Sequence, residues 1–341
     1  MSKNYLGNSA EFPTRLSLFA IFSPTLRNHT RTGCVYQKNK MINKMKVAAA
    51  QLTPVYLNLE KTVDKACNAI VEAGKQGAQL IVFPESFISG YPDWVWLYPP
   101  HKSKELGDLY VQLVENAVSI PDNTTDRLCK AAKAANINVV MGMNERNSET
   151  SNSSLFNTIL FISDEGEILG KHRKLMPTNC ERLIWAQGNG STLKSYDTSV
   201  GKLGGLICWE NFMPLARNAI YESGAQILAS PTWDKGDKWL ESMKHIAREG
   251  GLFVISNCMT LQVDDLPEEL KAIYPNDKKW ISTGQSCIIN PFGEIIAGPL
   301  DSKEGIIYAD IDLKDILVHK RRFDVVGHYA RPDVFNFSVN K

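Results

Sequence analysis

The sequence predicts one α/β domain, in which buried strands alternate with amphipathic helices. Short apolar runs of strand length recur along the chain, and segments with helical spacing of apolar residues lie between them. After residue 45, no shift to linker-like composition and no internal repeat interrupts this alternation. A chain of 341 residues could hold one large domain or two small ones. The unbroken pattern favours a single domain over residues 45–341.

The first half of the pattern begins with an apolar run at 46–52, which is expected to be a buried strand. An amphipathic helix follows, because apolar residues recur at helical spacing at Leu59, Val63, Ala66, Ile70 and Ala73. Next we expect a strand over 79–83, helices over 105–118 and 126–135, a strand over 137–143, and a hairpin whose strands are 157–162 and 168–171.

The second half continues in the same way. We expect a strand over 202–208, a helix over 215–223, a strand over 226–230, a helix over 239–249, a strand over 252–256, a hairpin with strands 286–290 and 295–297, and a strand over 305–311. Four segments lack clear periodicity and are expected to be loops, at 91–101, 144–154, 178–195 and 261–283. Loops of this length in a compact domain are usually functional or mobile.

Residues 1–44 differ from the rest of the chain. They carry several Lys and Arg residues but a single acid, Glu11, among many Ser, Thr and Asn residues. We expect a disordered extension, or translated sequence ahead of a true start at Met41 or Met45. The composition also leaves a transit peptide, and thus import into an organelle, open.

The composition excludes several classes of protein. The net charge is +1, so no basic field favours nucleic acid, and no apolar run is long enough to span a membrane. The seven cysteines show no CxxC pair and no metal-ligand spacing, so we expect reduced thiols, a cytoplasmic location and no metal site. The absence of HExxH and GxSxG motifs argues against metalloproteases and α/β-hydrolases.

Candidate catalytic side chains follow apolar runs at several points of the chain. Cys208 closes the run that starts at Leu203, and the chain then turns into Trp209-Glu-Asn. Glu85 follows the run at 80–83, and Lys174 ends a basic segment that Glu181 follows. Each residue alone is more often structural. Together, a thiol, a base and a cation at the ends of strands are the parts of a nucleophilic acyl-type catalyst.

Longer motifs around these residues resemble the nitrilase family of carbon–nitrogen hydrolases. They are Phe83–Trp94, Lys171–Thr178 with Glu181, Cys208–Arg217, His245–Gly250 and Val326–Val334, in the order found in the family. The resemblance spans about residues 46–337, and the Cys-Trp-Glu form favours the nitrile-cleaving branch over the amidase branches. It implies a four-layer αββα sandwich and a homodimer or larger homo-oligomer.

The resemblance also implies roles for individual residues. Cys208 would be the nucleophile, Glu85 the general base, and Lys174 the cation that stabilises developing charge. Glu181 would orient Lys174 and take part in proton transfer. We expect Tyr91, in an aromatic segment, to line the substrate pocket, with core or interface packing as the alternative. The backbone N–H of Trp209 is expected to contact the substrate as an oxyanion donor.

Two segments depart from the pattern common in the family. Trp185-Ala-Gln-Gly-Asn-Gly190 stands where members often have Trp-Gly-x-Gly-Asp-Gly, and Gly284-Gln-Ser286 stands where Gly-Gly-Ser is common. Both departures leave the catalytic set intact and bear on substrate preference and loop geometry.

The expected reaction is hydrolysis of a small organic nitrile to a carboxylic acid and ammonia, without a cofactor. A nitrile or cyanide hydratase, which releases an amide, and an amidase are the alternatives, because they share the same catalytic residues. A papain-like protease is disfavoured, since no His lies in a recognisable partner context. A catalytically silent scaffold on the same fold is a further alternative.

Overall fold

The computed structural model describes residues 44–99 and 101–341, so the expectation for the N-terminal extension falls, except for Lys44, outside the described residues. The first of two sheets has the order β13-β1-β2-β3-β4-β5. Its strands are β1 (Lys44–Gln51), β2 (Ala78–Val82), β3 (Asn138–Arg146), β4 (Leu155–Ile162), β5 (Ile168–Arg173) and β13 (Gly305–Asp312). Strands β1, β2 and β3 are parallel, and the other pairs are antiparallel.

The second sheet has the order β10-β11-β9-β8-β7-β6, with β12 also paired to β11. Its strands are β6 (Tyr196–Thr198), β7 (Gly201–Gly205), β8 (Ile227–Thr232), β9 (Phe253–Cys258), β10 (Thr260–Gln262), β11 (Trp280–Ile289) and β12 (Ile295–Asp301). Strands β7, β8 and β9 are parallel to one another. Parallel strands end at the same edge of a sheet, so the residues that follow β7 and β8 are neighbours.

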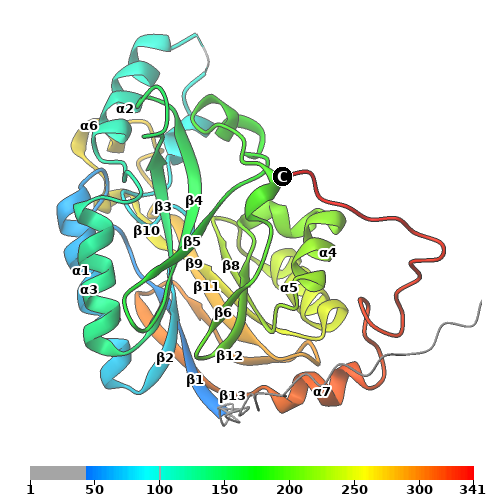
Figure 1. The fold of residues 1–341 in the computed structure, drawn as a ribbon. Helices are drawn as coiled ribbons and strands as arrows, with labels where there is room; N and C mark the ends of the chain where they lie inside the picture. Colours follow the sequence, from blue (N-terminus) through cyan, green and yellow to red (C-terminus); the bar gives the residue numbers. More distant parts are fainter. Residues whose placement is uncertain (1–43, 100) are drawn as a thin grey trace, which may run out of the picture. The chain divides into compact units, whose positions relative to one another are not determined.

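Helices cover the outer face of each sheet (Figure 1). Helices α1 (Leu59–Lys75) and α3 (Asn123–Ala135) cover the first sheet, and α4 (Pro214–Glu222) and α5 (Asp237–Gly250) cover the second. Helix α2 (Ser103–Glu115), α6 (Glu268–Lys271) and α7 (Lys314–Lys320) complete the set of α-helices in the described residues. None of the helices in that part of the chain is long and apolar enough to cross a membrane.

Side chains that alternate between the two faces of a strand contact a different layer of the structure on each face. In β1, Ala48 and Ala50 pack with α1, whereas Val47 and Ala49 pack with the second sheet, because successive side chains of a strand point to opposite faces. The core between the sheets joins Val47 and Ala49 to residues of β7 and β8 such as Leu203 and Ile227. The layers therefore run helices, sheet, sheet, helices, which confirms the expected αββα sandwich.

The ends of several elements differ from the sequence-based expectation. The strand expected over 202–208 ends at Gly205, and Cys208 instead opens a short 3-10 helix, η4 (Cys208–Phe212). Cys208 has a φ of 51°, which no strand residue adopts, and the backbone N–H of Ile207 bonds the Glu210 side chain instead of a strand. The loop expected over 261–283 was partly wrong, since β10, α6 and the start of β11 lie within it, and α7 was not foreseen.

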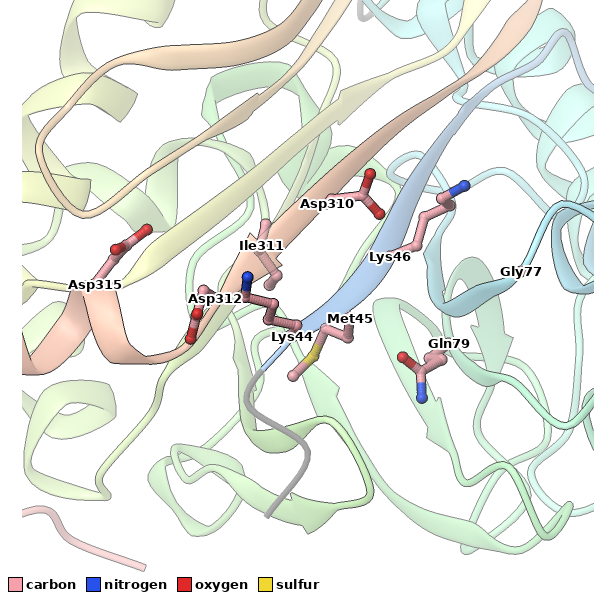
Figure 2. A pocket seen from close by; sticks show the side chains of 9 residues that line it. All are labelled: Lys44, Met45, Lys46, Gly77, Gln79, Asp310, Ile311, Asp312 and Asp315. Atoms are coloured by element: carbon pink, nitrogen blue, oxygen red, sulfur yellow. The ribbon is translucent and has the colours of Figure 1, made fainter. Parts of the chain in front are cut away.

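A cavity of about 500 Å³ lies at the edge where β1 and β2 begin (Figure 2). Lys44 and Lys46 of β1 and Asp310 and Asp312 of the antiparallel β13 line it. Glu85 follows the opposite, carboxyl end of β2. This cavity is therefore remote from the predicted catalytic residues, and it holds none of them.

Gly142 of β3 allows the segment that carries Glu85 to lie against the sheet. A Cβ atom at Gly142 would clash with the carbonyl oxygen of Pro84. We therefore expect Gly142→Ala to displace this segment and to destabilise the fold by about 1–3 kcal/mol, the usual cost of overpacking. Thermal unfolding measures the effect as a lower melting temperature.

Gly107 provides the matched control, because it lies in α2 and a Cβ atom there would meet nothing within 4 Å. Gly107→Ala should raise the melting temperature, since Ala in a helix interior is favoured over Gly by about 0.5–1 kcal/mol. Equal melting temperatures for the two variants would contradict the close approach at Pro84.

Candidate active site

Three of the predicted catalytic side chains project from the ends of strands of both sheets. Glu85 follows β2, Lys174 follows β5, and Cys208 lies three residues beyond the end of β7. Glu181 lies in the 3-10 helix η2 (Asn179–Leu183). All four side chains are buried. The structure thus brings together residues that are more than 120 positions apart in the sequence.

Lys174 bridges the two carboxylates. Its Nζ atom lies 2.9 Å from Glu85 Oε1 and 2.7 Å from Glu181 Oε2. Glu85 Oε1 also accepts a hydrogen bond of 2.6 Å from Asn157 Nδ2. The other oxygen, Glu85 Oε2, is buried and has no hydrogen-bond partner among the described residues. One carboxylate oxygen of Glu85 is therefore left for a proton or a ligand.

Glu181 differs from Glu85 because both of its oxygens are engaged. Besides Lys174, Glu181 Oε2 accepts a hydrogen bond of 2.6 Å from the backbone N–H of Thr178. Glu181 Oε1 accepts one of 2.7 Å from the Tyr91 hydroxyl, which in turn accepts one of 3.0 Å from Trp96 Nε1. These donors hold the Glu181 carboxyl group in place.

Burial and neighbouring charges set the protonation states. Burial, with a contribution from the Glu181 charge, raises the pKa of Glu85, although Lys174 and Asn157 oppose the rise. Burial alone would lower the pKa of Lys174, but the charges of Glu85 and Glu181 raise it, so Lys174 is an ammonium ion. Burial and the Glu85 charge raise the pKa of Cys208, which is therefore a thiol at neutral pH.

The turn at Cys208 is held by side chains on its inner side. The Asn211 amide donates hydrogen bonds of 3.0 Å to the carbonyl of Leu206 and 2.8 Å to that of Cys208. Glu210 accepts the backbone N–H of Ile207 at 2.8 Å. A positive φ in a residue other than Gly is strained, and such strain persists only where surrounding contacts fix it. These contacts fix the direction of the Cys208 thiol.

A buried histidine–carboxylate pair connects this turn to the strand that carries Lys174. His172 Nε2 lies 3.1 Å from Glu210 Oε2, and Glu210 Oε1 accepts the backbone N–H of Leu175 at 2.6 Å. Burial alone would raise the pKa of Glu210, but His172 and the N–H groups of Leu175 and Ile207 bring it below its usual value. Glu210 thus joins the end of β5 to η4.

Cys208 and Glu181 open onto a cavity of about 330 Å³. The cavity is largely aromatic and is lined by Tyr91, Trp96, Thr178, Asn179, Glu181, Cys208, Trp209, Trp233, Asp234 and Lys235. Tyr91 is buried and stacks on Trp233 with ring centroids 4.4 Å apart. The Trp209 side chain is 49% exposed, and its Nε1 atom donates a hydrogen bond of 2.8 Å to Asp234 Oδ2.

The first two backbone N–H groups of η4 have no hydrogen-bond acceptor within the helix. The first hydrogen bond of η4 runs from Glu210 N to Ile207 O at 3.1 Å, so the N–H groups of Cys208 and Trp209 precede it. Amides in the first turn of a helix have no partner within the helix. The N–H of Trp209 therefore has no acceptor within η4, and its expected role as an oxyanion donor stays a prediction.

The sequence did not point to several residues of the site. Asn157 lies inside β4, and Thr232 ends β8 and lies 3.3 Å from Cys208 Sγ. Trp233, Asp234 and Lys235 follow Thr232 and line the cavity. The apolar run at 226–230 was the one feature of the sequence that could have indicated these residues. It predicts a strand, and the residues that follow a strand parallel to β7 lie at the same edge of the sheet as Cys208.

Within the described residues, no cluster of His, Cys, Asp and Glu could hold a metal ion.

Gln285, which stands where the family commonly has Gly, has a φ of 73°. Glycine is favoured in this region of φ, which explains the family preference. Gln285 Oε1 accepts a hydrogen bond of 2.7 Å from the backbone N–H of Gly236, directly after the cavity-lining Lys235. This departure therefore acts on the geometry of the loop that lines the cavity.

Comparisons with known proteins agree with this geometry. A model of the carbon–nitrogen hydrolase family matches residues 46–320. Nitrilase 1 of Arabidopsis thaliana is 44% identical over 305 residues, which cover 87% of this chain and 87% of the relative. A bifunctional nitrilase/nitrile hydratase of Nicotiana tabacum is 39% identical over 308 residues, covering 88% of this chain and 87% of the relative.

Solved structures show the same fold. The crystal structure of a carbon–nitrogen hydrolase from Helicobacter pylori G27 matches with a TM-score of 0.66 and 20% identity, covering 86% of this chain and 97% of that chain. At this identity the likeness shows the fold alone. The family model and the relatives show the family as well as the fold. This chain belongs to the nitrilase family of carbon–nitrogen hydrolases.

Proposed function

We propose that this chain hydrolyses an organic nitrile to a carboxylic acid and ammonia, with Cys208 as the nucleophile. The observation that carries the proposal is the Cys208 thiol, which opens onto an aromatic cavity beside the buried Glu85–Lys174–Glu181 cluster. Relatives that are 44% and 40% identical are named nitrilases, which supports a nitrile over an amide as substrate.

The reaction begins with the transfer of the Cys208 proton to Glu85 as sulfur attacks the nitrile carbon. The C–S bond forms, Glu85 passes the proton on to the nitrile nitrogen, and a thioimidate results with Glu85 ionised again. Glu85 then activates a water molecule, which adds to the same carbon and gives a tetrahedral intermediate. Loss of ammonia leaves a thioester, and a second water hydrolyses it to the acid and restores the thiol.

Lys174 and the amide of Trp209 stabilise charge during these steps. A fixed ammonium ion and a backbone N–H in a site shielded from water stabilise a developing anion more than water does. The Lys174 Nζ atom is already fixed by the two carboxylates, so it needs no reorganisation when charge develops. Tyr91 positions Glu181 and, with Trp209, forms walls that orient the substrate.

The two carboxylates have different roles. Glu85 has a free buried oxygen and a raised pKa, which suits a general base that must accept a proton near neutral pH. Glu181 accepts hydrogen bonds from Lys174, Thr178 and Tyr91, so it orients Lys174. The expectation that Glu181 also takes part in proton transfer stays a prediction, which the Glu181→Gln variant tests.

Nitrile hydration is the second candidate reaction. The tetrahedral intermediate can expel the Cys208 thiolate instead of ammonia and release an amide. A relative that is 39% identical over 88% of this chain is named a bifunctional nitrilase/nitrile hydratase. The same residues serve both outcomes, so the ratio of acid to amide measures which bond breaks.

A panel of aliphatic and aromatic nitriles tests the reaction, with ammonia and the acid-to-amide ratio as readouts. We expect ammonia and acid from the wild-type chain and none from Cys208→Ala, because the covalent intermediate cannot form. Cys208→Ser should be nearly inactive, since a neutral hydroxyl attacks a nitrile poorly. Activity of Cys208→Ala at the wild-type level would contradict the mechanism.

Glu85→Gln and Glu181→Gln separate the two carboxylates. Loss of the general base should lower kcat by about 10²–10⁴-fold. Glu181→Gln should lower it by a smaller factor, because the amide oxygen can still accept a hydrogen bond from Lys174. Both variants are compared after circular dichroism shows that they are folded. Equal losses would indicate that both carboxylates transfer protons.

We further propose a homodimer or larger assembly of domains that each span residues 45–341, in the cytoplasm. Leu215 of α4 is 69% exposed, and Phe335 in the C-terminal segment is 73% exposed. Exposed apolar residues of this kind often mark contacts between subunits. The six cysteines in the described residues are unpaired, as expected in a reducing compartment. Light scattering measures the mass of the assembly.

A further inference from the structure

The side chain of Thr232 meets the sulfur of Cys208 because of the register between β7 and β8. In this parallel pair, Gly205 lies opposite Ala229, and the backbone N–H of Leu206 bonds the carbonyl of Ala229 at 3.1 Å. Cys208 and Thr232 each lie three residues beyond that pair. The register therefore places the last residue of β8 beside the nucleophile, and both side chains are buried.

The hydrogen bonds around Thr232 orient its hydroxyl proton. The backbone N–H of Asp234 donates to Thr232 Oγ1 at 2.8 Å, so the hydroxyl oxygen already accepts a hydrogen bond. The single hydroxyl proton then has two acceptors in reach, namely Cys208 Sγ at 3.3 Å and the Asp234 carbonyl oxygen at 3.4 Å. Because an ionised sulfur accepts hydrogen bonds more strongly than a thiol, deprotonation of Cys208 favours the first acceptor.

The environment of Cys208 makes such a donor useful. Burial and the Glu85 charge raise the pKa of the thiol, while Lys174 and the Thr232 hydroxyl oppose the rise. Lys174 is shared with two carboxylates, so its charge is largely compensated. A hydroxyl adds a donor next to sulfur without adding a further charge to the buried cluster.

We propose that Thr232 is a further catalytic residue, whose hydroxyl donates a hydrogen bond to Cys208 Sγ as sulfur transfers its proton to Glu85. The same hydrogen bond stabilises the sulfur again when it leaves the thioester carbon. The inference rests on the proposed role of Cys208 as the nucleophile. Thr232 neither gains nor loses a proton in these steps, because it acts only as a donor.

Two substitutions isolate the hydroxyl. Thr232→Val keeps the shape of the side chain and removes the hydroxyl, both as the donor to sulfur and as the acceptor of the Asp234 N–H, whereas Thr232→Ser keeps both contacts and removes a methyl group. The first readout is the rate at which iodoacetamide alkylates Cys208, measured at a series of pH values by mass spectrometry of the peptide that contains Cys208. The plot of this rate against pH is the alkylation curve. The second readout is kcat/KM for a nitrile that the wild-type chain hydrolyses.

For Thr232→Val we expect the alkylation curve to move to higher pH and kcat/KM to fall by about 10–100-fold, the range that corresponds to loss of a hydrogen bond to a charged group. Thr232→Ser should keep the wild-type curve and stay within a few-fold of the wild-type kcat/KM. The opposite order, with the Val variant active and the Ser variant impaired, would overturn the proposal, since it would show that Thr232 acts by packing.

Ser256→Ala is the matched control. Ser256 is a buried hydroxyl of β9 in the same sheet, and it accepts a hydrogen bond of 2.8 Å from Trp239 Nε1. This variant should lower the melting temperature, because Trp239 Nε1 loses its acceptor, but leave the alkylation curve unchanged. A shift of the alkylation curve in Ser256→Ala would show that destabilisation of the sheet alone changes the reactivity of Cys208, and it would overturn the proposal.

The alkylation assay does not depend on nitrile turnover. An unchanged alkylation curve in Thr232→Val overturns the role of Thr232, even if the wild-type chain hydrolyses nitriles. Conversely, a shifted curve in a chain that hydrolyses no nitrile supports the contact between hydroxyl and sulfur and contradicts the proposed reaction. The two failures are therefore distinguishable.

Discussion

A lysine ammonium ion buried between two carboxylates is the interaction on which the rest of the site depends. Lys174 Nζ lies 2.9 Å from Glu85 and 2.7 Å from Glu181, and all three groups are shielded from water. Two negative charges and one positive charge leave an excess of negative charge in a medium that solvates it poorly. Donors from Asn157 and Tyr91 stabilise the carboxylates without changing this net charge, and a proton on Glu85 would neutralise it. The same imbalance that raises the pKa of Glu85 therefore suits it to take the thiol proton.

The two sheets supply the rigidity that this arrangement requires. Glu85 and Lys174 come from strands of the first sheet, and Cys208 comes from the second, so the core between the sheets fixes their separation. Glu210 crosses this division through its contact with His172. The strained backbone at Cys208 persists because the Asn211 amide donates a hydrogen bond to the Cys208 carbonyl and Glu210 accepts the backbone N–H of Ile207. The strain of the turn is thus offset by the packing that positions the thiol.

Periodicity was sufficient to predict the alternating strands and helices and the residues that follow apolar runs, because it reports burial along one element. The four layers were expected from the resemblance to the nitrilase family. Periodicity placed Glu85 and Cys208 at strand ends, but it extended β7 to Cys208, since the apolar residues Leu206 and Ile207 continue the run. The contact between Thr232 and Cys208 was not predicted, because it depends on the register between two strands. Contacts between distant elements leave no periodic signal in either element.

The central claim is that Glu85 is a buried base in a cluster with an excess of negative charge. The pH dependence of kcat/KM tests this claim most directly. This parameter reports the ionisation of the free enzyme. The base must be ionised to act, so activity should rise with pH through the pKa of Glu85, which burial and Glu181 raise. We predict an acid limb above the usual range of a glutamate, with loss of this limb in Glu85→Gln. A limb at the usual value for a solvated carboxylate, or one that persists in Glu85→Gln, would contradict the claim.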